Sequence, residues 1–411
     1  MKCGLLGRKL GHSYSPQIHA ILGDYSYELF EKEPEEIEAF LKSGCFDGIN
    51  VTVPYKKTVI PFLDGLSPVA ERLGAVNTIV HRNGKLIGHN TDCFGFLTMV
   101  RESGLDVADK KVLVLGSGGA SNTAVSVLEE LGGCVVVISR SGENNYKNLD
   151  LHKDASVIVN TTPVGMFPNT GVSPIDLSAF PALEGVLDVI YNPARTKLLL
   201  DAEKRGLVAV NGLLMLVAQA KEAAEWFTDA HIDDAVVPFV HSALRCQMEN
   251  IILIGMPGCG KSTVGKALAV HLGRHYVDAD AELEKKAGCS IPEIFASDGE
   301  SSFRALETKT LAELGQESGL IIATGGGCVT QGRNYPLLHQ NGTIFWLKRD
   351  IQKLPTDGRP LSQTTKIEDM YRIRKPMYEG FADFIVDNNA SLEDVLRQIG
   401  ECHTGKTRRK S

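Results

Sequence analysis

Short apolar runs alternate with amphipathic stretches along most of the chain. Stretches 123–132 and 213–227 repeat their apolar residues with the period of a helix. Runs rich in Val, Ile and Leu have the length of strands and lie at 110–116, 133–140, 155–163, 184–191, 250–256, 320–327 and 343–350. Continuous apolar strands separated by helices are typical of parallel sheets that are covered on both faces. The pattern therefore predicts the α/β class.

The alternation runs through two complete series, which predicts two folded parts. A chain of 411 residues is also too long for one core of ~150 residues. Segment 239–247 lies where the first series ends and the second begins, and it contains neither Gly nor Pro. We expect a short, fairly stiff connection there.

Composition excludes several classes of protein. The net charge of −7 argues against a general nucleic-acid-binding protein, which would be basic. No apolar run approaches the ~20 residues that cross a membrane, and the first residues lack the apolar core of a signal peptide. The nine cysteines include no CxxC pair, which is typical of thiols in a reducing compartment. We expect a cytoplasmic protein that binds neither nucleic acid nor membrane.

The segment that follows the run at 250–256 has the spacing of a Walker A motif. Gly255 is followed after four residues by Gly260, Lys261 and Ser262, where a helical pattern begins. In such a loop the backbone N–H groups face a nucleotide's β-phosphate, the lysine reaches the β- and γ-phosphates, and the serine ligates Mg²⁺. A chance glycine-rich turn is the alternative, but the strand, the spacing and the helix together favour nucleotide binding.

Polar residues further along the second part suggest an acceptor for a phosphate group. Asp278 and Asp280 are two residues apart, so on a strand both side chains would point to the same side. One carboxylate could then hold Mg²⁺ while the other orients a hydroxyl nucleophile. Three separated arginines and a glycine run at a strand end follow, namely Arg304, Arg359, Arg374 and Gly325, Gly326, Gly327. Each alone has an ordinary alternative: a solvated strand end, a surface arginine or a tight turn.

In their order along the chain, these motifs resemble those of shikimate kinase over about residues 248–400. The resemblance implies that Asp280 binds shikimate and activates the hydroxyl that is phosphorylated, and that Ser262 and Asp278 assist the metal. It implies that the three arginines hold the substrate carboxylate and the transferring phosphate, the latter being the role of Arg359, and that the glycine run lines the substrate site. The residues implied to bind ATP are Gly258, Cys259, Gly260, Lys261, Ser262 and Thr263.

The segment before Arg359 departs from that family. Only residues 351–358 separate it from the preceding strand, whereas the family usually has a longer helix there with an arginine near adenine. The contacts to adenine therefore stay open.

Segment 110–140 predicts a strand, a glycine turn, a helix and a second strand. Gly116, Gly118 and Ser121 form an incomplete dinucleotide-binding fingerprint, which this context strengthens. The second strand ends in Ser139–Ser141, "SRS", where an NAD site would have an acidic residue. An arginine and hydroxyls suit the 2′-phosphate of NADP, and nearby Glu143 leaves NAD as the alternative.

Segment 48–63, "GINVTVPYKKTVIPFL", predicts a strand that runs into a helix with Pro54 near its first turn. Lys56 would then lie at a helix N-terminus beside Lys57, where the dipole and the like charge disfavour its protonated form, so that it could exchange protons. A solvated surface lysine is the alternative. Asn77 and Asp92 lie in segments that could equally be turns.

The first part resembles shikimate dehydrogenase over roughly residues 1–240, through "HSYSP", "NVTVPYK", "GAVNT", "NTDCFG", "GSGGAS", "NTTPVGM", "YNPARTKLL" and "NGLLMLVAQA". The resemblance implies that Lys56 and Asp92 are the catalytic pair, with Val189 and Gly212 near the nicotinamide. The residues implied to bind substrate are Ser13, Ser15, Thr52, Asn77, Asp92, Tyr191 and Gln219. Those implied to bind NADP are Gly116, Ser117, Gly118, Gly119, Ala120, Ser121, Ser139, Arg140 and Ser141.

Together the two resemblances imply an α/β dehydrogenase at 1–240 and a P-loop kinase at 248–411. Within the first, residues 1–98 and 215–240 would form a substrate-binding lobe and 99–214 a Rossmann lobe. The expected activities are NADPH-dependent reduction of 3-dehydroshikimate and ATP- and Mg²⁺-dependent phosphorylation of shikimate. The alternatives are a quinate/shikimate dehydrogenase joined to another small-molecule kinase or to an ATP-sensing domain. The oligomeric state is not predicted.

Overall fold

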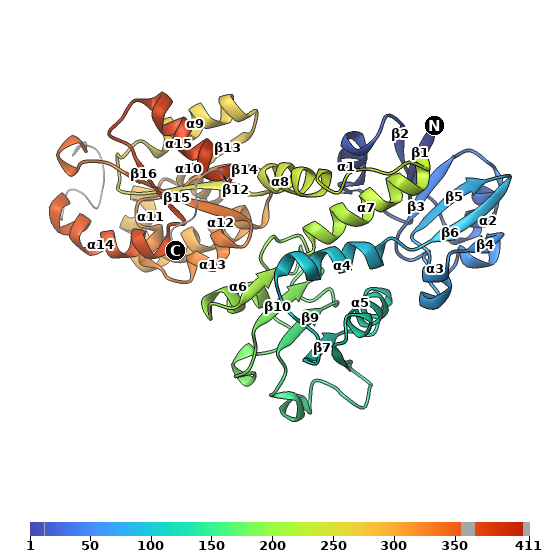
Figure 1. Ribbon diagram of the computed structural model, residues 1–411. Coiled ribbons are helices and arrows are strands. Elements are labelled where there is room, and N and C mark those ends of the chain that lie inside the picture. Colours follow the sequence, from blue (N-terminus) through green and yellow to red (C-terminus); the bar gives the residue numbers. More distant parts are fainter. Residues whose placement is uncertain (12, 355–365, 406–411) are drawn as a thin grey trace. The chain divides into compact units, whose positions relative to one another are not determined.

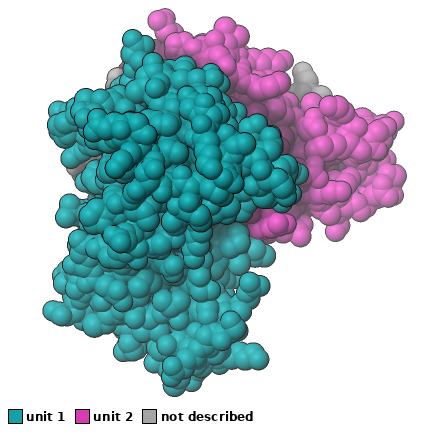
Figure 2. All heavy atoms as spheres, turned by 90° about the vertical axis from the view of Figure 1, so that its right-hand side faces the viewer, with its two compact units in different colours: residues 1–165, 172–191, 198–243 teal, residues 166–171, 192–197, 244–411 magenta. Residues whose placement is uncertain are grey.

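The computed structural model describes residues 1–11, 13–354 and 366–405 (Figure 1). It divides the chain into two compact units, which Figure 2 distinguishes by colour. The first unit comprises residues 1–165, 172–191 and 198–243, and the second comprises 166–171, 192–197 and 244–411. All seven apolar runs contain strands, as predicted, and the fold is α/β.

The first sheet of unit one is mixed, with strand order β2-β1-β3-β5-β6-β4. Its strands are β1 (Lys2–Gly7), β2 (Ser26–Glu31), β3 (Gly48–Val51), β4 (Gly65–Leu66), β5 (Thr78–Arg82) and β6 (Lys85–His89). β1 lies parallel to β2 and β3, whereas β5 is antiparallel to both β3 and β6. Three α-helices occur along this part: α1 (Ser15–Leu22), α2 (Ile37–Lys42) and α3 (Pro68–Leu73).

The second sheet of unit one is parallel throughout, in the order β11-β10-β9-β7-β8. Its strands are β7 (Lys111–Leu115), β8 (Cys134–Ile138), β9 (Val157–Asn160), β10 (Gly185–Asp188) and β11 (Val208–Val210). Helices α5 (Gly119–Glu130) and α6 (Lys197–Lys204) alternate with these strands. The central strands β7 and β9 are almost entirely buried because helices and loops cover both faces of the sheet.

Helices α4 (Asp92–Ser103) and α7 (Leu213–Thr228) pack against each other within unit one. Their backbones approach closely at Gly95, where an added Cβ would lie 2.6 Å from the carbonyl oxygen of Met215. Glycine permits this approach because it has no side chain. As a result, Asp92 at the start of α4 and Gln219 on α7 line one pocket.

The predicted connection at 239–247 is helical. Helix α8 (Val236–Met248) contains the whole segment, and the boundary between the two units falls at residues 243 and 244. No residue of the segment is Gly or Pro, so nothing in its sequence interrupts a helix.

Unit two contains a parallel sheet in the order β13-β14-β12-β15-β16. Its strands are β12 (Asn250–Ile254), β13 (His275–Asp278), β14 (Leu320–Ala323), β15 (Gly342–Lys348) and β16 (Phe384–Asp387). Its helices are α9 (Lys261–Leu272), α10 (Ala279–Ala287), α11 (Ile291–Ser297), α12 (Gly299–Gln316), α13 (Asn334–His339), α14 (Ile367–Phe381) and α15 (Leu392–His403). The apolar core of this unit is built on the fully buried residues of β12, β14 and β15.

The helix predicted after Pro54 does not form. β3 ends at Val51, and the following backbone bonds mainly join residues three apart, from Tyr55 N to Thr52 O and from Ile60 N to Lys57 O. That spacing makes turns that end in a short 3₁₀ segment, η2 (Ile60–Phe62). Lys56 is therefore not at an α-helix N-terminus, and its surroundings come from elsewhere in the fold. Among the described helices, none combines the length and the apolarity needed to cross a membrane.

Candidate functional site

The first pocket of unit one is centred on an ion pair. Lys56 Nζ lies 2.6 Å from Asp92 Oδ2, and the Asp92 side chain is only 15% exposed. Asn77 donates from Nδ2 to the other Asp92 oxygen at 2.9 Å, and its own Oδ1 accepts from the backbone N–H of Thr91 at 2.7 Å. Both oxygens of Asp92 are thus held, and the carboxylate in turn fixes the position of the lysine ammonium.

The same pocket gathers every residue predicted to bind substrate in the first part. Its lining includes Ser13, Ser15, Thr52, Lys56, Asn77, Asp92, Tyr191 and Gln219, together with Val189 and Gly212. These residues come from loops and turns beside the first sheet, from helices α1, α4 and α7, and from the segments that follow β10 and β11. Burial raises the pKa of Tyr191, so its phenol is a neutral group that can donate to an anion.

Sequence reasoning missed Asn50, which also lines this pocket. It is the residue of β3 two positions before Thr52, and its Nδ2 donates to the carbonyl oxygen of Asn77 at 3.3 Å. Tyr27 donates its hydroxyl to Asn50 Oδ1 at 2.8 Å. Alternation along the strand places Asn50 and Thr52 on the same side, which is a signal that the sequence offered.

A second pocket of unit one lies at the glycine turn after β7. It is lined by Gly116, Ser117, Gly118, Ser139 and Arg140, and by Tyr146, Thr161, Thr162, Pro163, Val164 and Pro174. Gly116 has φ +114°, and a Cβ there would lie 2.7 Å from Thr161 Oγ1, so only glycine fits this turn. This glycine lets the turn pack against Thr161. A Cβ at Gly118 would meet nothing within 4 Å, so the space beside the turn is open to a ligand, as a phosphate-binding loop requires.

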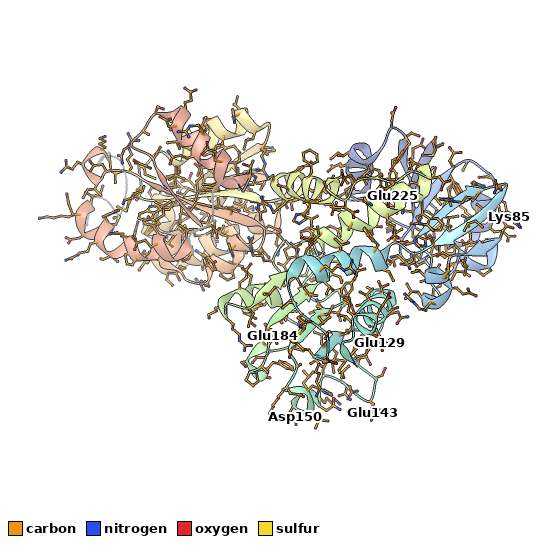
Figure 3. All side chains as sticks on the ribbon, in the orientation of Figure 1. Lys85, Glu129, Glu143, Asp150, Glu184 and Glu225 are labelled. Carbon is orange, nitrogen blue, oxygen red and sulfur yellow. The ribbon has the colours of Figure 1, made fainter. Side chains whose placement is uncertain are left out.

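Not all of the predicted cofactor residues face this second pocket. Ser121 is buried, and its hydroxyl donates to the Gly116 carbonyl at 2.8 Å, so it stabilises the turn itself. Ala120 lines the first pocket, whereas Gly119 and Ser141 line neither. Glu143 is exposed in the loop after β8 (Figure 3).

The loop that carries Arg140 is tied to its own backbone. Ser139 Oγ accepts from Gly142 N at 2.9 Å, and Ser139 N donates to Asn144 O at 3.1 Å. Tyr146 follows in the same loop and lines the pocket beside Arg140; sequence reasoning missed it, and a lone tyrosine in a loop carries no motif to reveal it. The loop therefore presents one arginine to the pocket from a hydrogen-bonded turn.

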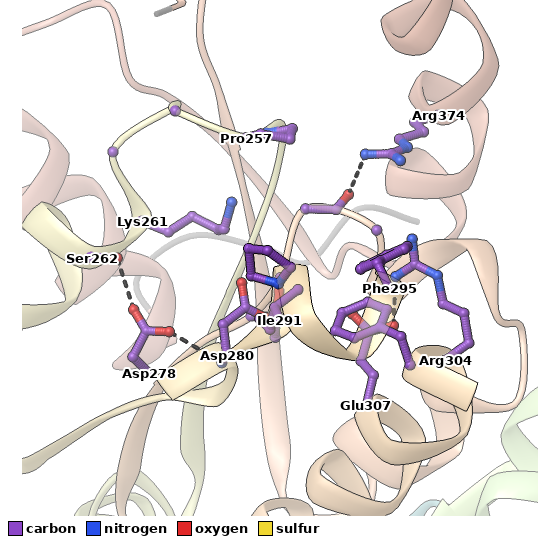
Figure 4. A pocket seen from close by; sticks show the side chains of 18 of the residues that line it. Pro257, Lys261, Ser262, Asp278, Asp280, Ile291, Phe295, Arg304, Glu307 and Arg374 are labelled. Carbon is purple, nitrogen blue, oxygen red and sulfur yellow. Dashed lines mark hydrogen bonds and ion pairs between the residues drawn. The ribbon is translucent and has the colours of Figure 1, made fainter. Parts of the chain in front are cut away.

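The pocket of unit two is lined by the Walker loop, by acidic residues including Asp280 and by two arginines (Figure 4). Lys261 donates from Nζ to the carbonyl oxygens of Gly255 and Met256, at 2.9 and 3.1 Å. Ser262 Oγ lies 3.0 Å from Asp278 Oδ2. Gly258, Gly260 and Thr263 line the same pocket, whereas Cys259 is fully buried and does not.

Asp278 and Asp280 are not both on a strand, so the predicted geometry of the pair is wrong. Asp278 ends β13 and caps α10, accepting from the backbone N–H of Asp280 at 3.2 Å, and Asp280 lies in the first turn of that helix. Both nevertheless line the pocket. Burial, with contributions from neighbouring Glu307 and Asp278, raises the pKa of Asp280 to about 6.

Arg304 and Arg374 line the same pocket as Asp278 and Asp280. Arg304 Nη1 lies 2.7 Å from Glu307 Oε2, and both residues are buried on α12. Arg374 Nη1 donates to the Gly326 carbonyl at 3.2 Å. Sequence reasoning missed Glu307, although its position three residues after Arg304 on a helix predicts the pair.

The glycine run after β14 has no room for side chains. A Cβ at Gly325 would lie 2.6 Å from Asp280 Oδ1 and 3.0 Å from Glu307 Oε1. A Cβ at Gly327 would overlap the Arg304 guanidinium, at 2.6 Å from Nη1. The glycines thus allow this turn to approach the charged groups of the site. Arg359 and the predicted lid lie outside the described residues.

Ser262 and Asp278 fit a magnesium site of the kind found beside a nucleotide. The serine hydroxyl and the carboxylate are oxygen donors already 3.0 Å apart, and both line the loop pocket. Within the described residues, no group of three or more His, Cys, Asp or Glu is arranged to hold a metal ion.

Known proteins match both parts of the chain. A family model described as the shikimate dehydrogenase substrate binding domain matches residues 5–79. A shikimate dehydrogenase (NADP(+)) of Clostridium perfringens is 35% identical over 267 residues, which covers 59% of this chain and 98% of that protein. The chain belongs to the shikimate dehydrogenase family. Its residues 257–404 match the family model for shikimate kinase, so a shikimate kinase domain follows the dehydrogenase.

Solved structures agree with the dehydrogenase assignment. The shikimate 5-dehydrogenase of Thermus thermophilus in complex with NADP(H) and shikimate has a TM-score of 0.55 at 31% identity, covering 59% of this chain and 99% of that one. A quinate dehydrogenase of Corynebacterium glutamicum in complex with NAD has a TM-score of 0.53 at 28% identity, covering 59% and 97%.

Proposed function

We propose that this chain carries out two consecutive reactions on one carbon skeleton. The dehydrogenase part reduces 3-dehydroshikimate to shikimate with NADPH, and the kinase domain phosphorylates shikimate with ATP. The observation that carries the proposal is that two independent family matches on one chain both name shikimate.

In the reduction, Lys56 is the proton donor and Asp92 its positioning partner. NADPH held at the glycine turn of the second pocket would have its nicotinamide beside Val189 and Gly212 of the first, and would there supply a hydride to the substrate's carbonyl carbon. The ammonium of Lys56 donates a proton to the oxygen, which becomes the new hydroxyl. Asp92, fixed by Asn77, keeps that ammonium oriented. Neutral donors in the same pocket, including Ser13, Ser15 and Tyr191, suit the substrate carboxylate.

In the phosphorylation, Asp280 accepts the proton of the attacking hydroxyl. ATP supplies the phosphoryl group, and a new O–P bond forms as ADP leaves. Arg304 and Arg374 are cations that suit the carboxylate of shikimate, and Lys261 suits the phosphates. Ser262 and Asp278 are the groups we assign to Mg²⁺. Arg359 remains our candidate for the lid cation.

The test is a coupled assay with the full chain. NADPH oxidation is followed with 3-dehydroshikimate, and shikimate 3-phosphate is then measured after ATP and Mg²⁺ are added. We expect both activities. Binding of ATP without any shikimate 3-phosphate would instead support an ATP-sensing second domain.

A second candidate is a dehydrogenase that prefers quinate and NAD. It is favoured by the similarity to a quinate dehydrogenase in complex with NAD and by exposed Glu143 in the cofactor loop. Arg140 favours NADP, because a guanidinium suits the 2′-phosphate that NAD lacks. The rates of oxidation of shikimate and of quinate, each measured with NADP⁺ and with NAD⁺, decide between the two candidates.

A further inference from the structure

Arg349 lies directly after β15, next to the nucleotide-binding loop. A Cβ at Gly260 would lie 3.6 Å from Arg349 Nη1 and 3.1 Å from the side-chain nitrogen of Asn388. Gly260 precedes Lys261, the first residue of α9, so the guanidinium lies beside the end of the loop that faces the phosphates.

This position of Arg349 is fixed by bonds between the ends of β15 and β16. Asn388 donates its backbone N–H to Lys348 O at 2.8 Å, and its side chain donates to the Cys259 carbonyl of the loop. Asp350 N donates to Asn389 Oδ1 at 3.0 Å. The two strand ends and the loop are therefore joined around Arg349.

The charge of Arg349 is not balanced within the part of the chain that the structure describes. It forms no ion pair there, and its Nε is buried without a hydrogen-bond partner. The two nearby carboxylates have other partners, because Asp350 accepts from Gln352 N at 3.0 Å and Asp387 accepts from Asn389 N at 3.0 Å.

A permanent cation without a partner is unfavourable at this place. The N-terminus of α9 carries a partial positive charge, and the ammonium of Lys261 lies on its first turn. Guanidinium, ammonium and helix dipole thus concentrate positive charge around one loop. An anion bound there removes the repulsion and supplies the missing partner for Nε.

We propose that Arg349 is a further nucleotide-binding residue, whose guanidinium donates hydrogen bonds to the phosphate chain of ATP beside Gly260. The proposal rests on the kinase function proposed above. Arginine suits this role because its planar fork of donors matches phosphate oxygens and keeps its charge at every physiological pH.

The test compares Arg349→Gln and Arg349→Lys with Lys348→Gln in the full chain. Lys348 is the preceding cation, and it is exposed at the end of the same strand, so its loss controls for general charge. The measurements are the KM values for ATP and shikimate, and the Kd values for ADP and for inorganic tripolyphosphate by calorimetry. The rate of NADPH oxidation checks that the rest of the chain is intact.

We expect Arg349→Gln to raise the KM for ATP and the Kd of both probes by about 10- to 100-fold. The KM for shikimate should stay unchanged, Arg349→Lys should recover part of the loss, and Lys348→Gln should resemble the unmodified protein. An unchanged Kd for tripolyphosphate with a raised Kd for ADP would overturn the proposal, because the contact would then be to the base. Unchanged ATP and ADP binding in Arg349→Gln would also overturn it. The Kd values do not require turnover, so a chain that binds ADP but fails to phosphorylate shikimate refutes the function without affecting this test.

Discussion

Lys56 and Lys57 are adjacent in the sequence, yet their side chains meet different surroundings. Lys56 forms the ion pair with Asp92 in the first pocket, whereas Lys57 is exposed. We predict that Lys56→Ala lowers kcat/KM for reduction by about 10²- to 10⁴-fold, the usual contribution of a positioned proton donor. Lys57→Ala is the matched control and should leave it unchanged. Steady-state NADPH oxidation measures both, and equal losses would contradict the assignment.

Asp280, our proposed proton acceptor, also has a cost to stability. Its pKa of about 6 in the folded protein exceeds the ordinary 3.8, so the folded state binds this proton more tightly than the unfolded state. The ionised carboxylate therefore destabilises the fold above about pH 6, and the cost disappears as the pH falls from about 6 to about 4. We expect phosphorylation to have the opposite pH dependence, because only the ionised form of the proposed base accepts a proton.

We predict that Asp280→Asn abolishes phosphorylation while it stabilises the kinase domain by about 1–2 kcal/mol at pH 8. In the unmodified protein, kcat/KM for shikimate should fall as the pH drops through about 6. Denaturant unfolding and a pH–rate profile measure the two effects. A less stable variant, or a flat profile across that range, would contradict the burial argument.

Arg140 provides the residue-scale test of cofactor choice. Its guanidinium lines the pocket at the glycine turn, so Arg140→Ala should raise the KM for NADPH by about 10-fold or more and leave that for NADH unchanged. Glu143→Gln, in the same loop, serves as the control and should not weaken NADPH binding. Equal effects of Arg140→Ala on both cofactors would exclude a contact with the 2′-phosphate.

At the scale of elements, the close approach of the turn after β14 to α12 determines the shape of the kinase pocket. Gly327→Ala would place a Cβ against the Arg304 guanidinium and displace it. We predict that this change raises the KM for shikimate at least about 10-fold, while the Kd for ADP stays unchanged. Gly332→Ala is the matched control, since a Cβ there meets nothing within 4 Å. A variant with normal affinity for shikimate would show that Arg304 does not bind it.

The sequence predicted strands and motifs better than it predicted the geometry between them. Apolar runs located most strands of both parallel sheets because buried strands are continuous apolar runs, but they did not reveal β11 or β16, which are only partly buried. Two local expectations were wrong. Turns replaced the helix expected after Pro54, and Asp280 lies in α10 instead of extending β13. Asn50 and Glu307 were missed although strand alternation and helix spacing signalled them. Tyr146 carries no such signal, and only the folded chain brings it beside Thr161 and Thr162 in the pocket of the glycine turn.

At the scale of the whole molecule, each pocket is lined by residues of one unit alone. We therefore predict that the two reactions are separable. A mixture of Lys56→Ala and Asp280→Asn proteins should convert 3-dehydroshikimate to shikimate 3-phosphate, although neither variant does so alone. Chromatography of the products measures this conversion. If the mixture stays inactive while each variant retains its other activity, shikimate does not pass freely between molecules.

The bonds that Lys261 forms to the carbonyls of Gly255 and Met256 have a consequence for the entropy of binding. Its ammonium already closes the loop on itself, at 2.9 and 3.1 Å. The arrival of a phosphate is thus an exchange of partners for one side chain, and the backbone of this loop, residues 255–261, does not have to be ordered at that moment. The affinity gained from the phosphate contacts is then not spent on conformational entropy of the loop.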